Sequence, residues 1–259
     1  PPVPSDKELG FFVVTRSEAL GSLKRVGILP PRLPFAFDDR QDVKDALSSI
    51  VTEYIKKAGM EPVPPKTFTE SYDRFNRAVG GIYDPKTGAA RTEEAKAVYT
   101  NARREFIESD LLDGYVIISV ISRDAPFSSP YADWDGVRER SSGRLPVNGV
   151  AEFLLGDSTT QGTLSAYSVA VQLSNAQHQI VFGRLGGLQL VSYYDAQKSK
   201  ALNNFMRVPT NDLFRDNARL DRAVREATLP LVLSGEQIAN GKNDPKVNAS
   251  LVSRGMDVL

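Results

Sequence analysis

The sequence predicts an α/β fold, in which a mixed β-sheet carries amphipathic helices on its faces, and three patterns support this prediction. Apolar residues recur at helical spacing in several segments. The nearly continuous apolar run DGYVIISVISRD at 113–124 is typical of a strand in the middle of a sheet covered on both faces. Apolar and polar residues alternate at 166–174, as in a half-buried strand. The 259 residues can bury a substantial core, and without an internal repeat or linker we expect one domain over 20–232.

The first expected elements are a short strand at 26–29, which the two following prolines should end, and a long helix at 41–58. Asp38 or Asp39 is expected to cap this helix at its amino end, and Gly59 suits its carboxyl end. The spacing of its apolar residues places eight of them on one face. They are Val43, Ala46, Leu47, Ile50, Val51, Tyr54, Ile55 and Ala58.

The connection at 30–39 has the position of a phosphate-binding loop, because it joins a strand to a helix. Such a loop needs glycines, so that backbone N–H groups can converge on the anion. This connection has three prolines, two phenylalanines and two aspartates, and it has no glycine. The sequence therefore argues against a phosphate site here.

Further along, we expect a short strand within MEPVPP and a helix opened by the capping-box pattern TFTE at 67–70. A second amphipathic helix is expected at about 92–110, and the apolar strand follows it. The segment 125–149 is expected to be an unusually long loop. After it come a β-meander and a last helix at 211–229, which Pro230 should end.

The two ends of the chain are expected to lie outside this domain. Residues 1–19 begin PPVPSDKELG, without Met or an apolar signal core, and this composition is typical of a tether. Residues 233–259 are rich in Gly, Asn, Asp and Lys and are expected to form a loose tail.

Composition excludes several functional classes. Lys plus Arg and Asp plus Glu both number 32, so no net charge attracts the chain to nucleic acid or anionic lipid. The absence of cysteine excludes thiol catalysis, disulfides and Cys-ligated metals. No run of 18 apolar residues could span a bilayer as a helix. We predict no cofactor, no metal and no nucleic-acid partner.

Two groups of residues could carry catalysis. The only histidine, His178, lies in a predicted hairpin turn between glutamines, without a second His or a GxSxG motif, so we interpret it as structural or solvated. In DWDGVRE, the acids Asp133, Asp135 and Glu139 could bind Ca²⁺ or form a carboxylate pair for hydrolysis. An ion-paired surface loop is the simpler interpretation, because neighbouring arginines can neutralise these acids.

The aromatic residues of the 125–149 segment suggest binding. Exposed aromatic side chains are favoured contact anchors, although aromatic residues under a long loop can also fold back and fill the core. We favour core filling for Phe127, and the two interpretations are balanced for Trp134. We predict this loop to be the partner-contact surface. The predicted contact residues are Phe127, Tyr131, Asp133, Trp134, Asp135 and Arg138.

The element order and three local patterns resemble the superfamily of bacterial envelope lipoproteins built on the fold of the TolB N-terminal domain. This superfamily includes the curli-secretion lipoprotein CsgG and penicillin-binding-protein activator lipoproteins. The patterns are VGILPP before a long helix, DLLDGYVIISVISR after a further helix, and VAVQLSNAQHQIVFGRLGG in the meander. Asp113 and Gly114 match the family's second pattern, whereas Asn175 and Gln177 replace its Asp and Gly in the third. The likeness covers about 20–232.

The resemblance implies a TolB N-terminal-domain-like fold in an exported protein that faces the periplasm of a Gram-negative bacterium. It implies a non-catalytic scaffold or regulator that binds envelope proteins and is tethered to the outer membrane by a lipid on a residue outside this chain. A homo-oligomer is compatible with it. The chain departs from the family in its long 125–149 segment and in having no Cys for the lipid. The alternatives are a hydrolase using the three acids, and a small-molecule-binding protein, which would show an apolar pocket with convergent polar groups.

Overall fold

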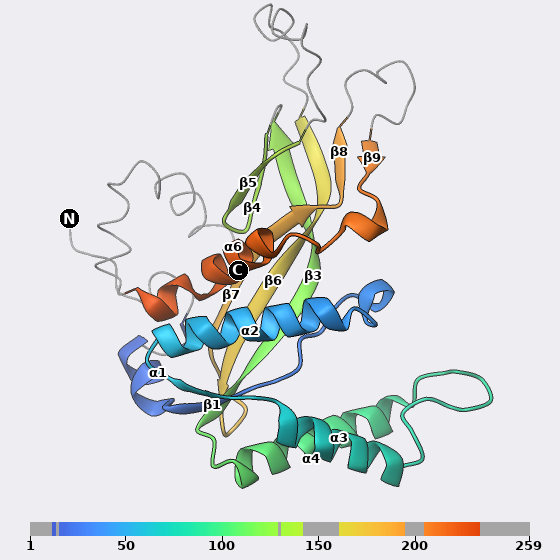
Figure 1. The fold of residues 1–259 in the computed structure, drawn as a ribbon, viewed down its shortest axis with the longest axis vertical. Coiled ribbons are helices and arrows are strands. Elements are labelled where there is room, and N and C mark those ends of the chain that lie inside the picture. Colours follow the sequence, from blue (N-terminus) through green and yellow to red (C-terminus); the bar gives the residue numbers. More distant parts are fainter. Residues whose placement is uncertain (1–11, 14–15, 129–130, 142–160, 195–204, 234–259) are drawn as a thin grey trace, which may run out of the picture.

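A computed structural model of the chain describes residues 12–13, 16–128, 131–141, 161–194 and 205–233. It confirms the α/β class: helices pack on a mixed sheet that curls along its length (Figure 1). The helices are α1 (Arg16–Ser22), α2 (Gln41–Lys57), α3 (Lys66–Ala78), α4 (Thr92–Ser109) and α6 (Asn217–Val232), with 3-10 turns at Phe35–Phe37 and Thr210–Asp212. The strands are β1 (Arg25–Ile28), β2 (Glu61–Val63), β3 (Gly114–Ser128), β4 (Tyr131–Trp134), β5 (Val137–Arg140), β6 (Gln161–Asn175), β7 (Ile180–Leu190), β8 (Ser192–Tyr194) and β9 (Phe205–Arg207).

Two long antiparallel strands, β3 and β6, form the spine of the sheet. They pair without a register shift from Gly114 opposite Asn175 to Ser128 opposite Gln161. β1 lies parallel to both β2 and β3 at one side, and β7 lies antiparallel to β6 at the other. The short β4–β5 hairpin continues the sheet from the far end of β3. β8 and β9 form a separate two-stranded sheet.

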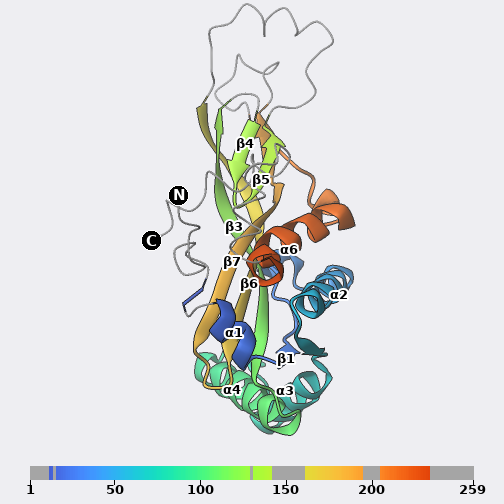
Figure 2. The same ribbon diagram turned by 90° about the vertical axis from the view of Figure 1, so that its left-hand side faces the viewer.

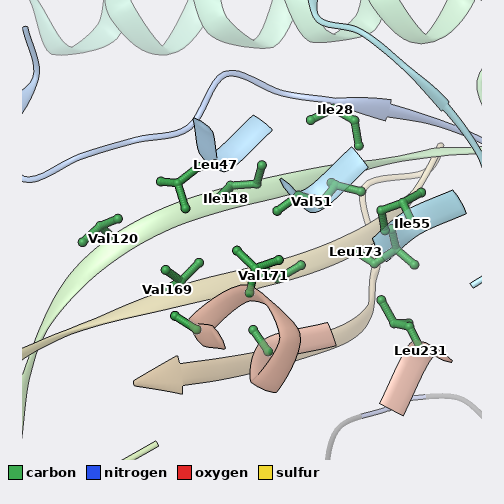
Figure 3. Packing of buried hydrophobic residues seen from close by; sticks show 14 of the residues in the cluster. Ile28, Leu47, Val51, Ile55, Ile118, Val120, Val169, Val171, Leu173 and Leu231 are labelled. Atoms are coloured by element: carbon green, nitrogen blue, oxygen red, sulfur yellow. The ribbon is translucent and has the colours of Figure 1, made fainter. Parts of the chain in front are cut away.

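Alternating side chains of the spine serve opposite faces of the sheet. Val116, Ile118 and Val120 on β3 face the main core, which α2 and α6 cover (Figures 2 and 3). Tyr115 belongs instead to a second core beneath α3 and α4, at the lower end of the molecule. Because successive residues of a strand point to opposite faces, these two helix pairs cover opposite faces of the sheet.

The apolar face predicted for the long helix is confirmed. Val43, Leu47, Val51 and Ile55 of α2 are buried in the main core, and Figure 3 shows the last three of these facing the sheet. The other four predicted residues are partly buried against the same core. Gly59 follows the helix with φ +84°, in the left-handed region that suits glycine.

The predicted amino-terminal caps of two helices are wrong. Arg40, not Asp38 or Asp39, occupies the N-cap of α2, and its side chain makes no capping bond. Asp38 instead forms an ion pair with Lys44 at 2.8 Å. Likewise α3 begins one residue before TFTE, after Pro65, so this pattern is no capping box. For α3, Pro65 stands directly before the first helical residue and determines where the helix begins.

The last helix continues past the residue expected to end it. α6 includes Pro230 and ends at Val232, because a proline so near the carboxyl end removes only one helical hydrogen bond. The side chain of Arg16 covers this end of the helix. It donates from Nε to the carbonyl of Pro230 at 2.9 Å and from Nη2 to that of Leu231 at 2.8 Å. A cation at the carboxyl end also suits the helix dipole.

The folded part of the chain begins before the predicted boundary at residue 20. Ala19 on α1 is fully buried in the main core. The ring of Phe12 packs at a tilt against that of Phe182 with centroids 5.0 Å apart, and the Val13 N–H donates to the Val181 carbonyl at 3.1 Å. Residues 12–13 and 16–23 therefore form a strap that contacts the start of β7 and the end of α6.

The described part of the predicted loop at 125–149 is largely β-structure. Residues 125–128 belong to β3, and residues 131–140 form the β4–β5 hairpin. Residues 129–130 and 142–149 lie outside the described part of the chain. Within that part, no helix is both long enough and apolar enough to cross a membrane.

Candidate functional site

The hairpin at the far end of the sheet contains most of the residues predicted to carry function. Asp135 and Gly136 form its turn with φ of +35° and +94°, conformations for which an Asp-Gly pair is favoured in two-residue hairpins. The hairpin curls over the sheet face opposite α2 and α6, and the Gly187 N–H on β7 donates to the Asp135 carbonyl at 2.6 Å. β3, β4, β5, β6 and β7 thus surround a small core of their own. Its members are Ala125, Phe127, Ala132, Trp134, Val137, Leu164, Ala166 and Leu190.

Two of the predicted contact aromatics fill this small core. Phe127 is 4% exposed and Trp134 is 5% exposed. Trp134 also donates from Nε1 to the Tyr167 carbonyl at 3.3 Å. Core filling is therefore confirmed for Phe127, and an exposed anchor at Trp134 is wrong. The alternation of β4 explains this result, because it turns Ala132 and Trp134 inward and Tyr131 and Asp133 outward.

The carboxylate of Asp135 holds the hairpin turn against the sheet. Its Oδ2 accepts from Arg123 Nε at 3.0 Å and from Ser168 Oγ at 2.7 Å, and the side chain is only 12% exposed. Arg123 lies on β3 and Ser168 on β6, so one carboxylate connects the turn to both strands of the spine.

Glu139 connects the other end of the hairpin to α6. Its Oε1 accepts from Arg222 Nη2 at 2.8 Å and lies 3.5 Å from Arg219 Nη1, with 11% of the side chain exposed. Arg222 Nη2 also donates to the Leu188 carbonyl at 3.0 Å. Asp135 and Glu139 are ion-paired as predicted, but with arginines of β3 and α6 instead of the neighbouring Arg138 or Arg140. Their predicted surface position is wrong.

Of the residues predicted to contact a partner, those on the outward face of the hairpin are accessible to solvent. We call Tyr131, Asp133, Arg138 and Arg140 the hairpin outer face; all four residues are solvent-exposed or partly exposed. The Arg138 guanidinium lies 4.6 Å from the centre of the Tyr131 ring, and its Nε is 3.7 Å from Asp133. The acids Asp133, Asp135 and Glu139 thus interact with different partners. Among the described residues, no group of three acidic or histidine side chains lies close enough together to hold a metal ion.

Two adjacent glycines let helix and hairpin approach β7 from opposite sides. A Cβ on Gly186 would lie 2.8 Å from the carbonyl carbon of Ala223 on α6. One on Gly187 would lie 2.8 Å from the carbonyl oxygen of Trp134 and 2.9 Å from Val137 Cβ. Neither position has room for a side chain. The two glycines are therefore required for close packing, Gly186 against α6 on one face of β7 and Gly187 against the hairpin on the other.

The sequence around His178 suggested that this residue has no partner, but the structure places it in a cluster of polar side chains. Its Nδ1 lies 3.3 Å from the hydroxyl of the buried Tyr115, and that hydroxyl accepts from Arg103 Nη1 at 3.2 Å. Partial burial lowers the pKa of His178, and the charge of Arg103 lowers it further. The ring is therefore neutral at pH 7. Sequence reasoning missed this cluster, because its members lie far apart along the chain.

A cleft of about 610 Å³ separates the amino-terminal ends of α2 and α6. Its floor is apolar, with Val43, Phe214 and Leu220, and its rim includes Arg40, Asp42, Asn211, Arg215 and Asn217.

Phe214 in this floor has φ +64°, which is costly for an aromatic residue. Its N–H donates to the buried Gln189 at 3.1 Å, and its ring packs edge-on against Phe37 with centroids 4.9 Å apart. These contacts hold the strained residue in place.

The charged groups at the cleft are already paired with each other. Arg40 bonds both carboxylate oxygens of Asp42 at 2.8 Å, which lowers the pKa of that acid. Asp216 accepts from the first amides of α6, at Ala218 and Arg219. The cleft therefore suits a neutral ligand with an apolar part better than a free anion.

Comparison of the chain with protein-family models and with curated proteins finds no match.

Proposed function

We propose that the protein is a non-catalytic component of a bacterial envelope complex, which scaffolds or regulates assembly or secretion through protein–protein contacts. It faces the periplasm and is tethered to the outer membrane by a lipid on a residue outside this chain. The sequence patterns shared with envelope lipoproteins motivate this proposal. The observation that carries it is the β4–β5 hairpin, whose inward acids are used to hold it rigidly while its outer face presents an aromatic ring and charges of both signs.

Rigid support is what makes the hairpin outer face suitable for binding. Asp135, Glu139 and the glycine pair of β7 fix the hairpin to four other elements, β3, β6, β7 and α6. A surface that is ordered before binding loses less conformational entropy when a partner docks. Tyr and Arg are also the residue types most enriched among interface anchors.

A crosslinking experiment in the producing cells tests this function. A photoreactive amino acid at Arg138 should crosslink the protein to a defined envelope protein, and cell fractionation should recover the adduct with the outer membrane. The same probe at Lys56, exposed on α2 on the other face of the sheet from α3 and α4, is the matched control. Recovery of the protein with the cytosol, or equal adducts from both positions, would contradict the proposal.

Of the alternatives, a hydrolase using the three acids is the less favoured, because arginines and a serine engage Asp135 and Glu139. Small-molecule binding is favoured by the cleft with its strained Phe214. Saturation-transfer NMR with a library of neutral amphipathic compounds would test it. Binders displaced by Ala46→Trp, which fills the cleft rim, would establish the site, whereas a library without binders would reject it.

A further inference from the structure

Two arginines stack against one tyrosine on the sheet face that α3 and α4 cover. The guanidinium carbon of Arg32 lies 4.5 Å from the centre of the Tyr99 ring, and that of Arg103 lies 5.5 Å from it. Arg103 is also 5.2 Å from the ring of Tyr115, beyond which lies His178. We call these five residues the arginine–tyrosine row.

The fold brings the row together from four separate segments: the stretch after β1, α4, β3 and the turn between β6 and β7. Arg32 follows β1, and its N–H donates to the Ile118 carbonyl at 2.9 Å while its carbonyl accepts from the Val120 N–H at 2.8 Å. The backbone there runs beside β3, and Leu33 enters the main core while Arg32 is exposed toward the opposite face. Tyr99 and Arg103 are four residues apart on α4 and therefore share one side of that helix.

The positive charge of the row is not neutralised within the described part of the chain. Neither Arg32 nor Arg103 forms an ion pair there, although most other described arginines do. Two acids that could be considered as partners form ion pairs with other residues: Asp38 pairs with Lys44, and Glu105 on α4 pairs with Arg74.

One buried polar atom of the row also lacks a partner. Among the residues described, Nε of Arg103 makes no hydrogen bond, whereas the hydroxyl of Tyr99 interacts with the side chain of Arg32. Burial raises the pKa of Tyr99, so its hydroxyl keeps its proton and can act as a donor. Unsatisfied buried donors are rare in native proteins and call for an explanation. Next to the row, the same sheet face continues through the half-buried Ile117, Ser119 and Ile121.

We propose that the arginine–tyrosine row is a docking surface for an acidic, extended segment of a partner protein. Carboxylates of that segment pair with Arg32 and Arg103, and its apolar side chains lie along Ile117 and Ile121. Guanidinium groups bind carboxylates through two parallel hydrogen bonds, and arginines already stacked on an aromatic ring have less freedom to lose. The inference rests on the proposed binding function, but it concerns a second surface at the other end of the sheet from the hairpin (Figure 1).

Fluorescence anisotropy with a defined peptide tests this surface. The probe is a labelled twelve-residue peptide of alternating Glu and Leu, and the comparison peptide has Gln in place of each Glu. The purified chain should bind only the Glu peptide. Arg32→Gln and Arg103→Gln should each weaken binding by about tenfold, as loss of a charge-assisted bond predicts. Arg104→Gln is the control, because this neighbouring arginine is exposed and bonds Asn101.

Arg103 touches the buried Tyr115, so its variant must first be shown by circular dichroism to fold. Arg32 is exposed, and its variant tests the idea independently of folding. Equal binding of the two peptides, or equal affinities in Arg32→Gln and Arg104→Gln, would overturn the proposal. Tighter binding of a single-stranded oligonucleotide with the same dependence on Arg32 would replace the protein partner with nucleic acid. Self-association that depends on Arg32 would replace it with a second copy.

The two proposals can fail separately. If the Glu peptide does not bind while the Arg138 crosslink persists, only the arginine–tyrosine row is rejected. If the peptide binds while crosslinking at Arg138 fails, the hairpin loses its assigned role and the row remains.

Discussion

Replacing Trp134 with alanine is the sharpest test of the hairpin, because it separates a core residue from a contact anchor. Trp134 is 5% exposed within the small core, so truncation should remove nearly all of its burial. Large aromatic truncations in cores cost about 3–5 kcal/mol. The bond from Nε1 to the Tyr167 carbonyl is long at 3.3 Å and adds about 0.5–1 kcal/mol at most. We expect a total loss of about 3.5–6 kcal/mol in the free energy of unfolding.

Urea denaturation followed by far-ultraviolet circular dichroism is the appropriate assay, because the chain has a single Trp and the variant cannot be followed by tryptophan fluorescence. Tyr131→Ala on the same strand is the matched control. Tyr131 points outward and is 39% exposed, so its truncation should cost no more than about 0.5–1 kcal/mol. Equal losses for the two variants at unchanged m-value would refute the packing described here.

Three further predictions concern the cores and the histidine. Leu47→Ala should cost about 2–5 kcal/mol and Ile50→Ala clearly less, because Leu47 is fully buried whereas Ile50 flanks the core; equal losses in chemical denaturation would contradict this ranking. Gly186→Ala should destabilise by about 1–3 kcal/mol, since its Cβ would meet the backbone of α6, while Gly183→Ala, with open space around it, should be near neutral in the same assay. His178 has a lowered pKa in the folded state, so the unfolded chain takes up the proton first and stability should fall as pH drops below about 6.5. His178→Gln should reduce this fall between pH 7 and 5, and an unchanged slope of unfolding free energy against pH would count against it.

Local sequence patterns predicted the features that depend on a single helix or strand, such as which side of α2 is buried. The spacing of Leu47, Val51 and Ile55 indicates the buried side of α2 directly, since helical periodicity follows from burial on one face. The hairpin was missed because four-residue strands give too short an alternation to stand out among charges. A signal was nevertheless present: Asp135-Gly136 between Trp134 and Val137 is the composition expected of a two-residue hairpin turn.

The contacts between elements could not be predicted in this way. Tyr115, Arg103 and His178 meet only because β3 pairs with β6 and α4 crosses their ends. A local sequence pattern cannot predict a contact between residues that lie so far apart in the sequence. The same reason explains why the roles of Asp135 and Glu139 escaped prediction, since their partners lie on β3, β6 and α6.

The strap at residues 12–13 and 16–23 has a consequence for the order in which the parts of the chain reach their native positions. Arg16 bonds the carbonyl of Pro230, which lies 214 positions later in the sequence, and Phe12 pairs with Phe182. The strap can therefore reach its final position only after α6 has docked. Until then, the apolar side of β6 and β7 has only part of its cover. Contacts of such long range slow the final step of folding, so the chain should depend on chaperones that shield this surface until α6 is in place.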